Sequence, residues 1–541
     1  MRMDKKLAAT AMAALMASSV LAGCGNESKE ATQAKDNGNA TATEANGGEN
    51  TNSTERPTIS FMLTDHSGHS LANDHSDEVI AKMEEYTNTH VEFRWEANDT
   101  YKDKFGVTLM DKDNMPMILT SASGEIDSNV LNAAKKGAFW DLTEFLKDEE
   151  AYPNLSKADP DVLKALTVDG KIIGLYRSRA IGRYGMSYRT DWAEKVGYSE
   201  PPKNIDELYD MMDKFAHGDP DGNGKDDTYG MELCKYTGPL DIIQTWFGVG
   251  NGWVEQDGKL VPVHQTPEYM EALNWMKSLV DNGIVRKDWA AVDSTTWGDG
   301  IKKGEAGVFV DVMDGAKRAW DYYENNDVKS VTNPDEFASI TYVGAFAKDD
   351  SMEPRTLATS GFNGFYMITK DGAKTEEDVK NCLHFLDKMN DNEMLVLADY
   401  GLEGVTYEIN EEGKVELLNT GLDATQNPHN GLNQTLTYIP NAASTDPVVV
   451  KDEHTSLMEE VQNENAKVAV KNPATEYLVN SETNTSSGAD LKQILDDART
   501  QYISGAIDEA GLQAAWQTWS DRGGAKLIEE VNAQYQGDQN K

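Results

Sequence analysis

The chain has little cysteine and little positive charge. Its 541 residues include 3 Cys, and 50 Lys and Arg stand against 92 Asp and Glu, which makes the formal charge −42 at pH 7. A field of this sign repels nucleic acid and anionic lipid surfaces, so neither is expected as a partner. Beyond Cys24, nothing local pairs Cys234 with Cys382, and we expect two buried thiols.

Long apolar runs are missing after the first 23 residues, so the body is predicted to contain no membrane-spanning helix. Catalytic signatures are missing too: there is no His-Glu-x-x-His, no Gly-x-Ser-x-Gly and no catalytic cysteine context. These absences favour a binding protein over a hydrolase.

The N-terminus has the features of an export signal. A basic start is followed by an uncharged stretch over 7–20, and Leu-Ala-Gly precedes Cys24. This end resembles the bacterial lipobox, which implies cleavage before Cys24, a diacylglycerol on its thiol, and anchoring outside the cytoplasm. The alternative is an ordinary secretory leader in which a cysteine happens to follow the cut.

Residues 24–56 hold almost no large apolar side chain, so they are predicted to be a disordered tether. The body that follows is too long for one core and long enough for two or three. Strand patterns at 59–63, 91–95 and 117–119 alternate with helical patterns at 79–86, capped by Ser76, and at 105–110. This β-α-β-α order predicts an α/β fold with a largely parallel sheet, and ligands bind off the carboxyl ends of such strands.

An acidic loop carries a cation-binding spacing. Oxygen-bearing side chains stand at positions 1, 3, 5 and 9, the carbonyl of the residue at position 7 is a further ligand, and Gly224 lies at the turn position 6. The expected structural Ca²⁺ ligands are Asp219, Asp221, Asn223, Lys225 and Asp227. Position 12 is Gly230 where a sensor EF-hand has Glu, so another ligand must be supplied, and an ion-free polar turn is the alternative.

Several segments, in their order along the chain, resemble extracellular solute-binding proteins of the sugar-binding class, including alginate-oligosaccharide-binding members. They are the stretches 139–143, 169–175, 188–192, 201–208, 364–369, 400–407 and 516–535. The resemblance implies a two-lobe, periplasmic-binding-protein-like α/β fold of type II, with discontinuous lobes joined by hinge crossovers. The implied ranges are a leader at 1–23, the tether at 24–56, lobe 1 at 57–180 and 364–410, and lobe 2 at 181–363 and 411–541.

The same resemblance implies a function. A monomeric, lipid-anchored receptor would close around an oligosaccharide, neutral or acidic, and deliver it to an ABC permease without altering it. Sugar rings need flat aromatic platforms, and Trp246 and Trp253, which flank three glycines, are the best candidates. The alternative is that one or both pack in a core.

Four arginines lie within thirteen residues: Arg177, Arg179, Arg183 and Arg189. Tyrosines such as Tyr184 are interleaved with them. A guanidinium can hold a carboxylate or paired hydroxyls, which predicts Arg179 and Tyr184 as ligand contacts. The alternative is ion pairing with the chain's own carboxylates.

The resemblance places further candidates at the lobe interface: Asp65, Ser121, Asp311 and Glu403. Two other classes stay open. The Asp- and His-rich segment 65–75 would suit a metal-binding receptor. A glycoside hydrolase with paired carboxylates is the other alternative.

Overall fold

The computed structural model describes residues 56–65, 75–98, 100–293, 296, 298–418, 431–440 and 449–539. The predicted leader, Cys24, the tether up to residue 55 and the histidines at 66 and 69 lie outside these residues. The chain from Arg56 onward clusters as one compact unit.

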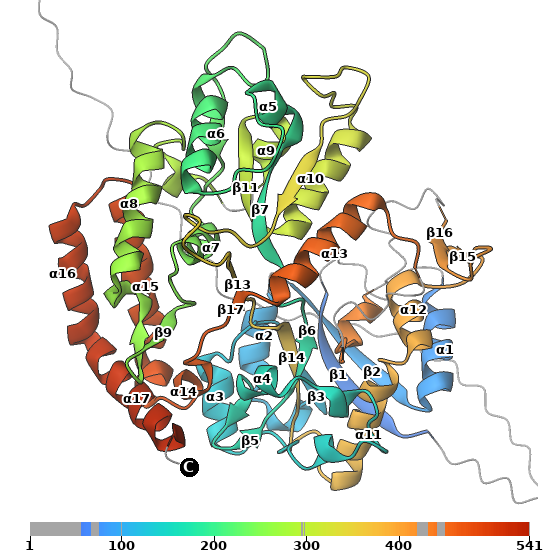
Figure 1. Cartoon of the computed structure of the whole chain (residues 1–541). Coiled ribbons are helices and arrows are strands. Elements are labelled where there is room, and N and C mark those ends of the chain that lie inside the picture. Colours follow the sequence, from blue (N-terminus) through green and yellow to red (C-terminus); the bar gives the residue numbers. More distant parts are fainter. Residues whose placement is uncertain are drawn as a thin grey trace, which may run out of the picture. The chain divides into compact units, whose positions relative to one another are not determined.

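Five strands form the first sheet, in the order β2-β1-β3-β14-β6 (Figure 1). Their bounds are Thr58–Asp65 (β1), His90–Ala97 (β2), Ile118–Ser121 (β3), Leu175–Ser178 (β6) and Phe362–Ile368 (β14). The strands predicted at 59–63, 91–95 and 117–119 are confirmed, and β1 runs parallel to β2 and β3. The sheet is nevertheless mixed, because β14 is antiparallel to β3 and β6. The chain leaves this sheet after β6 and returns in β14, which runs in the direction opposite to β3 and β6.

Four strands form the second sheet, in the order β12-β7-β11-β8. They are Tyr184–Arg189 (β7), Tyr229–Met231 (β8), Ala306–Val312 (β11) and Ile340–Val343 (β12). Strand β7 is antiparallel to both neighbours, whereas β11 and β8 are parallel. Because β14 follows the second sheet in sequence yet belongs to the first, the first sheet is assembled from two separated stretches of chain, whereas all strands of the second sheet lie between β6 and β14.

Helices fill the connections in both sheets (Figure 1). Those in the connections of the first sheet are Ser76–Thr87 (α1), Tyr101–Thr108 (α2), Ser128–Lys135 (α3), Pro160–Lys164 (α4), Glu376–Lys388 (α11) and Asn392–Tyr400 (α12). Those in the connections of the second sheet are Thr190–Lys195 (α5), Ile205–His217 (α6), Gly238–Trp246 (α7), Pro267–Asp281 (α8), Asp299–Lys303 (α9) and Met313–Asn325 (α10). The last part of the chain forms Glu453–Ala466 (α13), Thr475–Val479 (α14), Glu482–Ile503 (α15), Glu509–Trp519 (α16) and Ala525–Gln539 (α17).

Short strand pairs complete the fold. They are Thr167–Val168 with Lys171–Ile172 (β4, β5), Trp253–Gln256 with Lys259–Pro262 (β9, β10), Thr356–Leu357 with Ala469–Val470 (β13, β17), and Tyr407–Ile409 with Val415–Leu417 (β15, β16).

Helix α6 shows how local sequence produces these elements. The side chain of Asn204 accepts hydrogen bonds from the backbone N–H groups of Asp206 and Glu207, at 3.1 and 3.0 Å, and so caps the helix. Both acidic residues lie in the first turn, where the helix dipole favours them. Leu208, Met211, Met212 and Phe215 recur at helical spacing and are buried. In α1, by contrast, Ser76 is the first helical residue and His75 takes the cap position without a side-chain bond. Ser76 is therefore not the cap that the sequence predicts.

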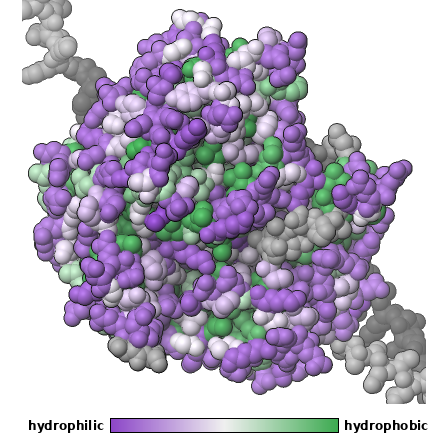
Figure 2. Space-filling view, in the orientation of Figure 1, coloured by the Kyte–Doolittle hydropathy of each residue, from purple (hydrophilic) through white to green (hydrophobic). Residues whose placement is uncertain are grey.

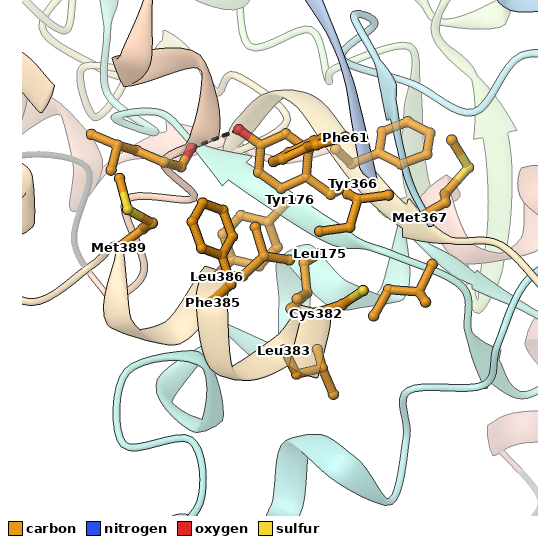
Figure 3. Packing of buried hydrophobic residues seen from close by; sticks show 14 of the residues in the cluster. Phe61, Leu175, Tyr176, Tyr366, Met367, Cys382, Leu383, Phe385, Leu386 and Met389 are labelled. Carbon is orange, nitrogen blue, oxygen red and sulfur yellow. Dashed lines mark hydrogen bonds between the residues drawn. The ribbon is translucent and has the colours of Figure 1, made fainter. Parts of the chain in front are cut away.

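Each sheet has its own core. In the first, Phe61 packs edge-on against Tyr366 and Phe385, with ring centroids 5.1 and 6.4 Å apart (Figure 3). The Tyr366 hydroxyl donates to the backbone carbonyl of Leu436 at 3.0 Å. Cys382 is fully buried in the same cluster, and burial raises the pKa of its thiol. Cys234 is buried and free as well, which confirms the two predicted thiols.

The crossing between the sheets passes closely under α13. A Cβ at Gly182 would lie 2.3 Å from the carbonyl oxygen of Gln462 and 2.4 Å from the backbone nitrogen of Ala466. Asn465 of α13 donates from Nδ2 to the carbonyls of Gly182 and Tyr184, at 3.0 and 2.8 Å. Only glycine allows this close approach of the two backbones. The side chain of Asn465 then holds α13 to the backbone of the crossing segment.

Candidate functional site

A cavity of about 1160 Å³ opens beside the crossing segments. It is lined by the β3–α3 loop with the start of α3, by α4, by α7 and the turn before β9, and by α14 and α15. The loop after β3 contributes Gly124 and Glu125 to the wall. The site thus lies at a carboxyl end of a parallel strand, as the sheet geometry predicts. In Figure 2 hydrophilic residues cover most of the visible face, and hydrophobic residues gather in patches across its middle.

The polar wall of the cavity is built around a buried ion pair. Arg499 of α15, whose side chain is 4 % exposed, donates from Nη1 to Asp241 of α7 at 2.5 Å. Its Nη2 donates to Asp496 at 3.3 Å. Burial lowers the pKa of Arg499, but Asp241, Tyr269 and Asp496 together raise it overall. Nε of Arg499 and Oε1 of Gln244 are buried without a protein hydrogen-bond partner. Buried polar groups of this kind are usually satisfied, so the wall offers one free donor and one free acceptor.

Aromatic side chains supply the other wall. Trp253, Tyr269 and Trp519 line the cavity together with His264. The His264 ring lies 4.5 Å from that of Trp519, and burial lowers the pKa of the imidazole to about 4. His264 is therefore neutral at neutral pH. Flat apolar surfaces opposite charge-assisted donors and acceptors suit a ligand with apolar faces and polar edges.

Acidic and phenolic groups continue the polar wall into the second sheet. Tyr184 starts β7, and burial together with the charge of Asp311 in β11 raises its pKa. Burial and the charges of Asp311, Tyr184 and Asp241 raise the pKa of Tyr236 in turn. The structure thus brings two predicted residues, Tyr184 and Asp311, together with two that sequence reasoning missed.

Tyr184 and Trp253 are the two predicted ligand residues that line the cavity. Trp246 instead ends α7 at 1 % exposure, with Phe346 and Trp275 packed edge-on at 5.3 and 6.4 Å. Ser121 is the last residue of β3 and is buried opposite Phe365. For Trp246, the core role that sequence analysis left open describes the placement; the burial of Ser121 was not anticipated.

The remaining predicted residues lie off the cavity wall. Asp65 ends β1 at the carboxyl edge of the sheet. Glu403 is exposed and forms an isolated bridge with Tyr407. Arg179 lies on the crossing segment, where its backbone N–H donates to Gly361 of the cavity wall at 2.9 Å.

Sequence reasoning missed Asp241, Gln244 and Arg499. The first two stand in the first and second turns of α7, shortly before Trp246. The prediction for Trp246 therefore identified the right helix, but other residues of that helix line the cavity. Arg499 lies some 250 positions further along the chain, and no spacing in the sequence links it to Asp241.

The acidic loop is pre-folded. Gly224 donates its N–H to both carboxylate oxygens of Asp219 at 3.2 Å. Asn223 Nδ2 donates to Asp221 at 2.6 Å and to Asp227 at 3.1 Å, so two carboxylates converge on one donor. Burial and the neighbouring charges of Asp219 and Asp227 raise the pKa of Asp221. Across the described ranges, no cluster of three or more His, Cys, Asp or Glu side chains has the arrangement of a metal site.

Within the described part of the chain, no helix combines the length and apolar character that crossing a bilayer requires.

Comparison with known proteins decides the family. Residues 78–415 match the family of bacterial extracellular solute-binding proteins. The chain belongs to this family. Lipoprotein LipO of Bacillus subtilis (strain 168) is 38 % identical over 465 residues, which cover 84 % of this chain and 88 % of LipO. The polygalacturonan/rhamnogalacturonan-binding protein YtcQ of the same organism is 30 % identical over 460 residues, 84 % of this chain and 87 % of YtcQ.

Solved structures of solute-binding proteins share the fold. FusA of Streptococcus pneumoniae in complex with kestose superposes with a TM-score of 0.61 at 18 % identity, covering 90 % of this chain and 100 % of FusA. The alginate-binding protein AlgQ2 without calcium ion gives 0.64 at 15 %, covering 90 % and 99 %. The two-lobe α/β fold inferred from the sequence is confirmed. The residue ranges given to each lobe stay predictions.

Proposed function

We propose that this solute-binding protein captures an oligosaccharide and presents it to an ABC permease. The observation that carries the proposal is the cavity itself, whose lining combines aromatic side chains with the Asp241–Arg499 pair and Gln244. Rings with apolar C–H faces and hydroxyl edges match that pairing of surfaces. A volume of about 1160 Å³ exceeds what a drug-sized ligand fills, which favours several linked rings.

The relatives support the same ligand class. YtcQ is described as binding polygalacturonan and rhamnogalacturonan. FusA of Streptococcus pneumoniae, 25 % identical over 269 residues, is described as the substrate-binding protein of a fructooligosaccharide ABC transporter. The metal-receptor and hydrolase alternatives are not favoured, since the matched proteins are solute-binding proteins. In the proposed mechanism the lobes close on an unaltered ligand by bending at the crossing segments.

The proposal extends to location and state. The leader ahead of Cys24 and the lipoprotein name of LipO support lipidation of this cysteine and anchoring on the outer face of the cell membrane. The protein would act as a monomer at the end of its tether.

Calcium in the acidic loop is part of the proposal. The donor set of carboxylates, an amide oxygen and the Lys225 carbonyl suits a hard cation, and the fold of the loop already brings Asp221 and Asp227 together. Among the structural neighbours, FusA has been solved as an EF-hand mutant and AlgQ2 without calcium ion. Asp219, Asp221, Asn223, Lys225 and Asp227 would hold the ion, which would neutralise the crowded carboxylates and stabilise the loop.

A thermal-shift panel followed by calorimetry tests the function. Neutral and acidic oligosaccharides of two to six units should include at least one that raises Tm and binds with micromolar affinity, about −8 kcal/mol. Asp241→Asn should weaken that binding about tenfold or more, because it removes a charge-assisted acceptor from the wall. Asp350→Asn, on an exposed loop, is the matched control. A panel without any binder, or product formed from the bound sugar, would overturn the proposal.

A further inference from the structure

His264 is carried on the cavity wall by a rigid stretch of backbone. It lies in the short helical turn Val263–Gln265, which joins β10 to α8. Pro262 precedes this turn and Pro267 begins α8, and the fixed φ of proline limits the backbone on both sides. The first N–H of the turn donates to the carbonyl of Gly252 at 3.0 Å, which ties the turn to the segment before β9. The imidazole is therefore placed by a rigid connection.

Two tryptophans of α16 fix the orientation of the imidazole. The ring of His264 is edge-on to that of Trp519, at an angle of 75°, and its centroid lies 5.7 Å from that of Trp516. Trp519 is itself closely packed, because a Cβ at Gly524 would lie 2.3 Å from Cε3 of its indole. The C-terminal helices thus set how the imidazole meets the cavity.

Both ring nitrogens of His264 reach the cavity. The residue is 4 % exposed, and it lines the cavity. Within the described part of the chain neither nitrogen forms a hydrogen bond, and neither is among the buried polar atoms that lack a partner. A nitrogen that has no protein partner and is not enclosed by protein borders open space, which for this ring is the cavity. Polar groups in buried positions are normally hydrogen-bonded, so both nitrogens are available to a ligand.

The protonation state of the ring decides what it can bind. Burial lowers the pKa of His264 to about 4, and among the described residues no neighbouring charge adds to this shift. At neutral pH the imidazole is therefore uncharged, with one nitrogen as a donor and the other as an acceptor. A hydroxyl group can serve both, because it donates and accepts. A carboxylate has no proton to give to the acceptor nitrogen.

The aromatic neighbours in the cavity lining have the same character. Trp253 and Trp519 line the cavity, and across the described ranges neither indole N–H has a partner or is enclosed by protein. This part of the lining therefore offers flat apolar rings with uncharged donors and one acceptor at their edges. Such a combination suits a sugar ring that carries hydroxyls and no charge.

We propose that His264 is a specificity-determining residue of the cavity, whose ring nitrogens exchange hydrogen bonds with the hydroxyls of one uncharged sugar unit. The inference rests on the proposed function and names a residue and the unit that it contacts. The unit beside His264, Trp253 and Trp519 is neutral, whether the other units of the oligosaccharide are neutral or acidic.

Two substitutions separate hydrogen bonding from packing. His264→Phe keeps a flat ring beside Trp519 and removes both nitrogens, whereas His264→Gln keeps a donor and an acceptor and removes the ring. Calorimetry on the full mature chain first tests fructo-, malto-, xylo- and galacturono-oligosaccharides, and the tightest binder becomes the probe. His264→Phe should weaken binding of this probe about tenfold without lowering Tm. His264→Gln should bind it more tightly than His264→Phe does, although its Tm should be lower. His217→Phe, at an exposed position, is the control.

Chemical labelling of the wild type tests whether the nitrogens face the ligand. Diethyl pyrocarbonate acylates uncharged imidazole nitrogens, and peptide mass spectrometry measures each histidine separately. His264 should be labelled near neutral pH, and saturating probe should protect it. The exposed His217 should be labelled equally with and without the probe.

The outcomes separate this inference from the proposed function. Wild-type affinity in His264→Phe together with weak binding by His264→Gln would assign the imidazole a packing role and overturn the inference. A His264 that resists labelling, or that is labelled equally while the probe is bound, would overturn it as well. Each of these results leaves the proposed function intact. Absence of binding by every sugar series would instead refute the proposed function, and the inference with it.

Discussion

At the scale of single residues, burial alone does not separate packing from recognition. Trp246 and Trp253 are both buried, at 1 and 6 % exposure, yet Trp253 borders the cavity and Trp246 does not. Arg183 and Arg179 are four positions apart, and one has a carboxylate partner while the other donates to a backbone carbonyl. Residue type and spacing predicted binding roles for these segments, and those roles stay predictions. The direction of each side chain depends on partners far away in the sequence.

The buried carboxyl of Asp399 leads to a prediction about the pH dependence of stability. Burial raises the pKa of its carboxyl from 3.8 to about 6. The native state therefore holds the proton more tightly than the unfolded chain, and the charged form is penalised above about pH 6 and not below about pH 4. Asp399→Asn should raise the free energy of unfolding by about 2–3 kcal/mol at pH 7.5, since one pKa unit is worth about 1.4 kcal/mol.

Urea unfolding of the wild type and Asp399→Asn at several pH values from 4 to 7.5 measures the difference in their free energies of unfolding. The stability gained by Asp399→Asn should shrink as the pH falls and vanish near pH 4. Asp350→Asn should show no such trend, since Asp350 is exposed. A gain that does not depend on pH would contradict the assignment of the cost to ionisation of Asp399.

At the scale of elements, local signals explain helices such as α6 and α11. The latter has a capping box in which Thr375 and Asp378 satisfy each other's backbone N–H groups. These signals are short-range, so sequence alone reveals them. Strand direction is not local in this sense. The first sheet is mixed because β14 enters it antiparallel to β3 and β6. No pattern within residues 362–368 reveals this direction.

The proposed calcium site in the acidic loop leads to a prediction about thermal stability. Excess Ca²⁺ should raise Tm of the wild type by several degrees relative to EDTA, because an ion relieves the repulsion among Asp219, Asp221 and Asp227. Asp221→Asn should lose most of that difference. Asp226→Asn, in the same loop but outside the liganding positions, should keep it. Identical melting curves of the wild type in EDTA and in Ca²⁺ would count against the ion.

At the scale of the whole molecule, the chain passes between its two sheets several times. The segment after β6, the pairing of β13 with β17, and α13 meet at these crossings. Asn251 links the ends of β13 and β17 by donating to the carbonyls of Ala358 and Val470, at 3.2 and 3.0 Å. In the proposed closure, bending concentrated in a few such residues would let the two packed cores move as rigid bodies.

Small-angle scattering tests this motion. A saturating oligosaccharide identified by the panel should reduce the radius of gyration, while a non-binding sugar of equal size should not. Circular dichroism should stay unchanged, because closure moves the cores without refolding them. An unchanged radius at full occupancy would contradict hinge closure.

The sequence by itself determined what depends on short-range chemistry. This covers the main strands and helices and, through ordered resemblance, the family. The export signal, the lipid site and the calcium loop stay predictions. Only the tertiary structure decided which side chains meet in the cavity. Arg499 reaches Asp241 across 258 positions, and the side chain of Arg179 donates to a backbone carbonyl where Arg183 and Arg189 pair with carboxylates. Local patterns establish secondary structure because hydrogen bonds and periodicity act within a few residues. A binding site instead collects side chains from distant elements, and only packing determines which of them come together.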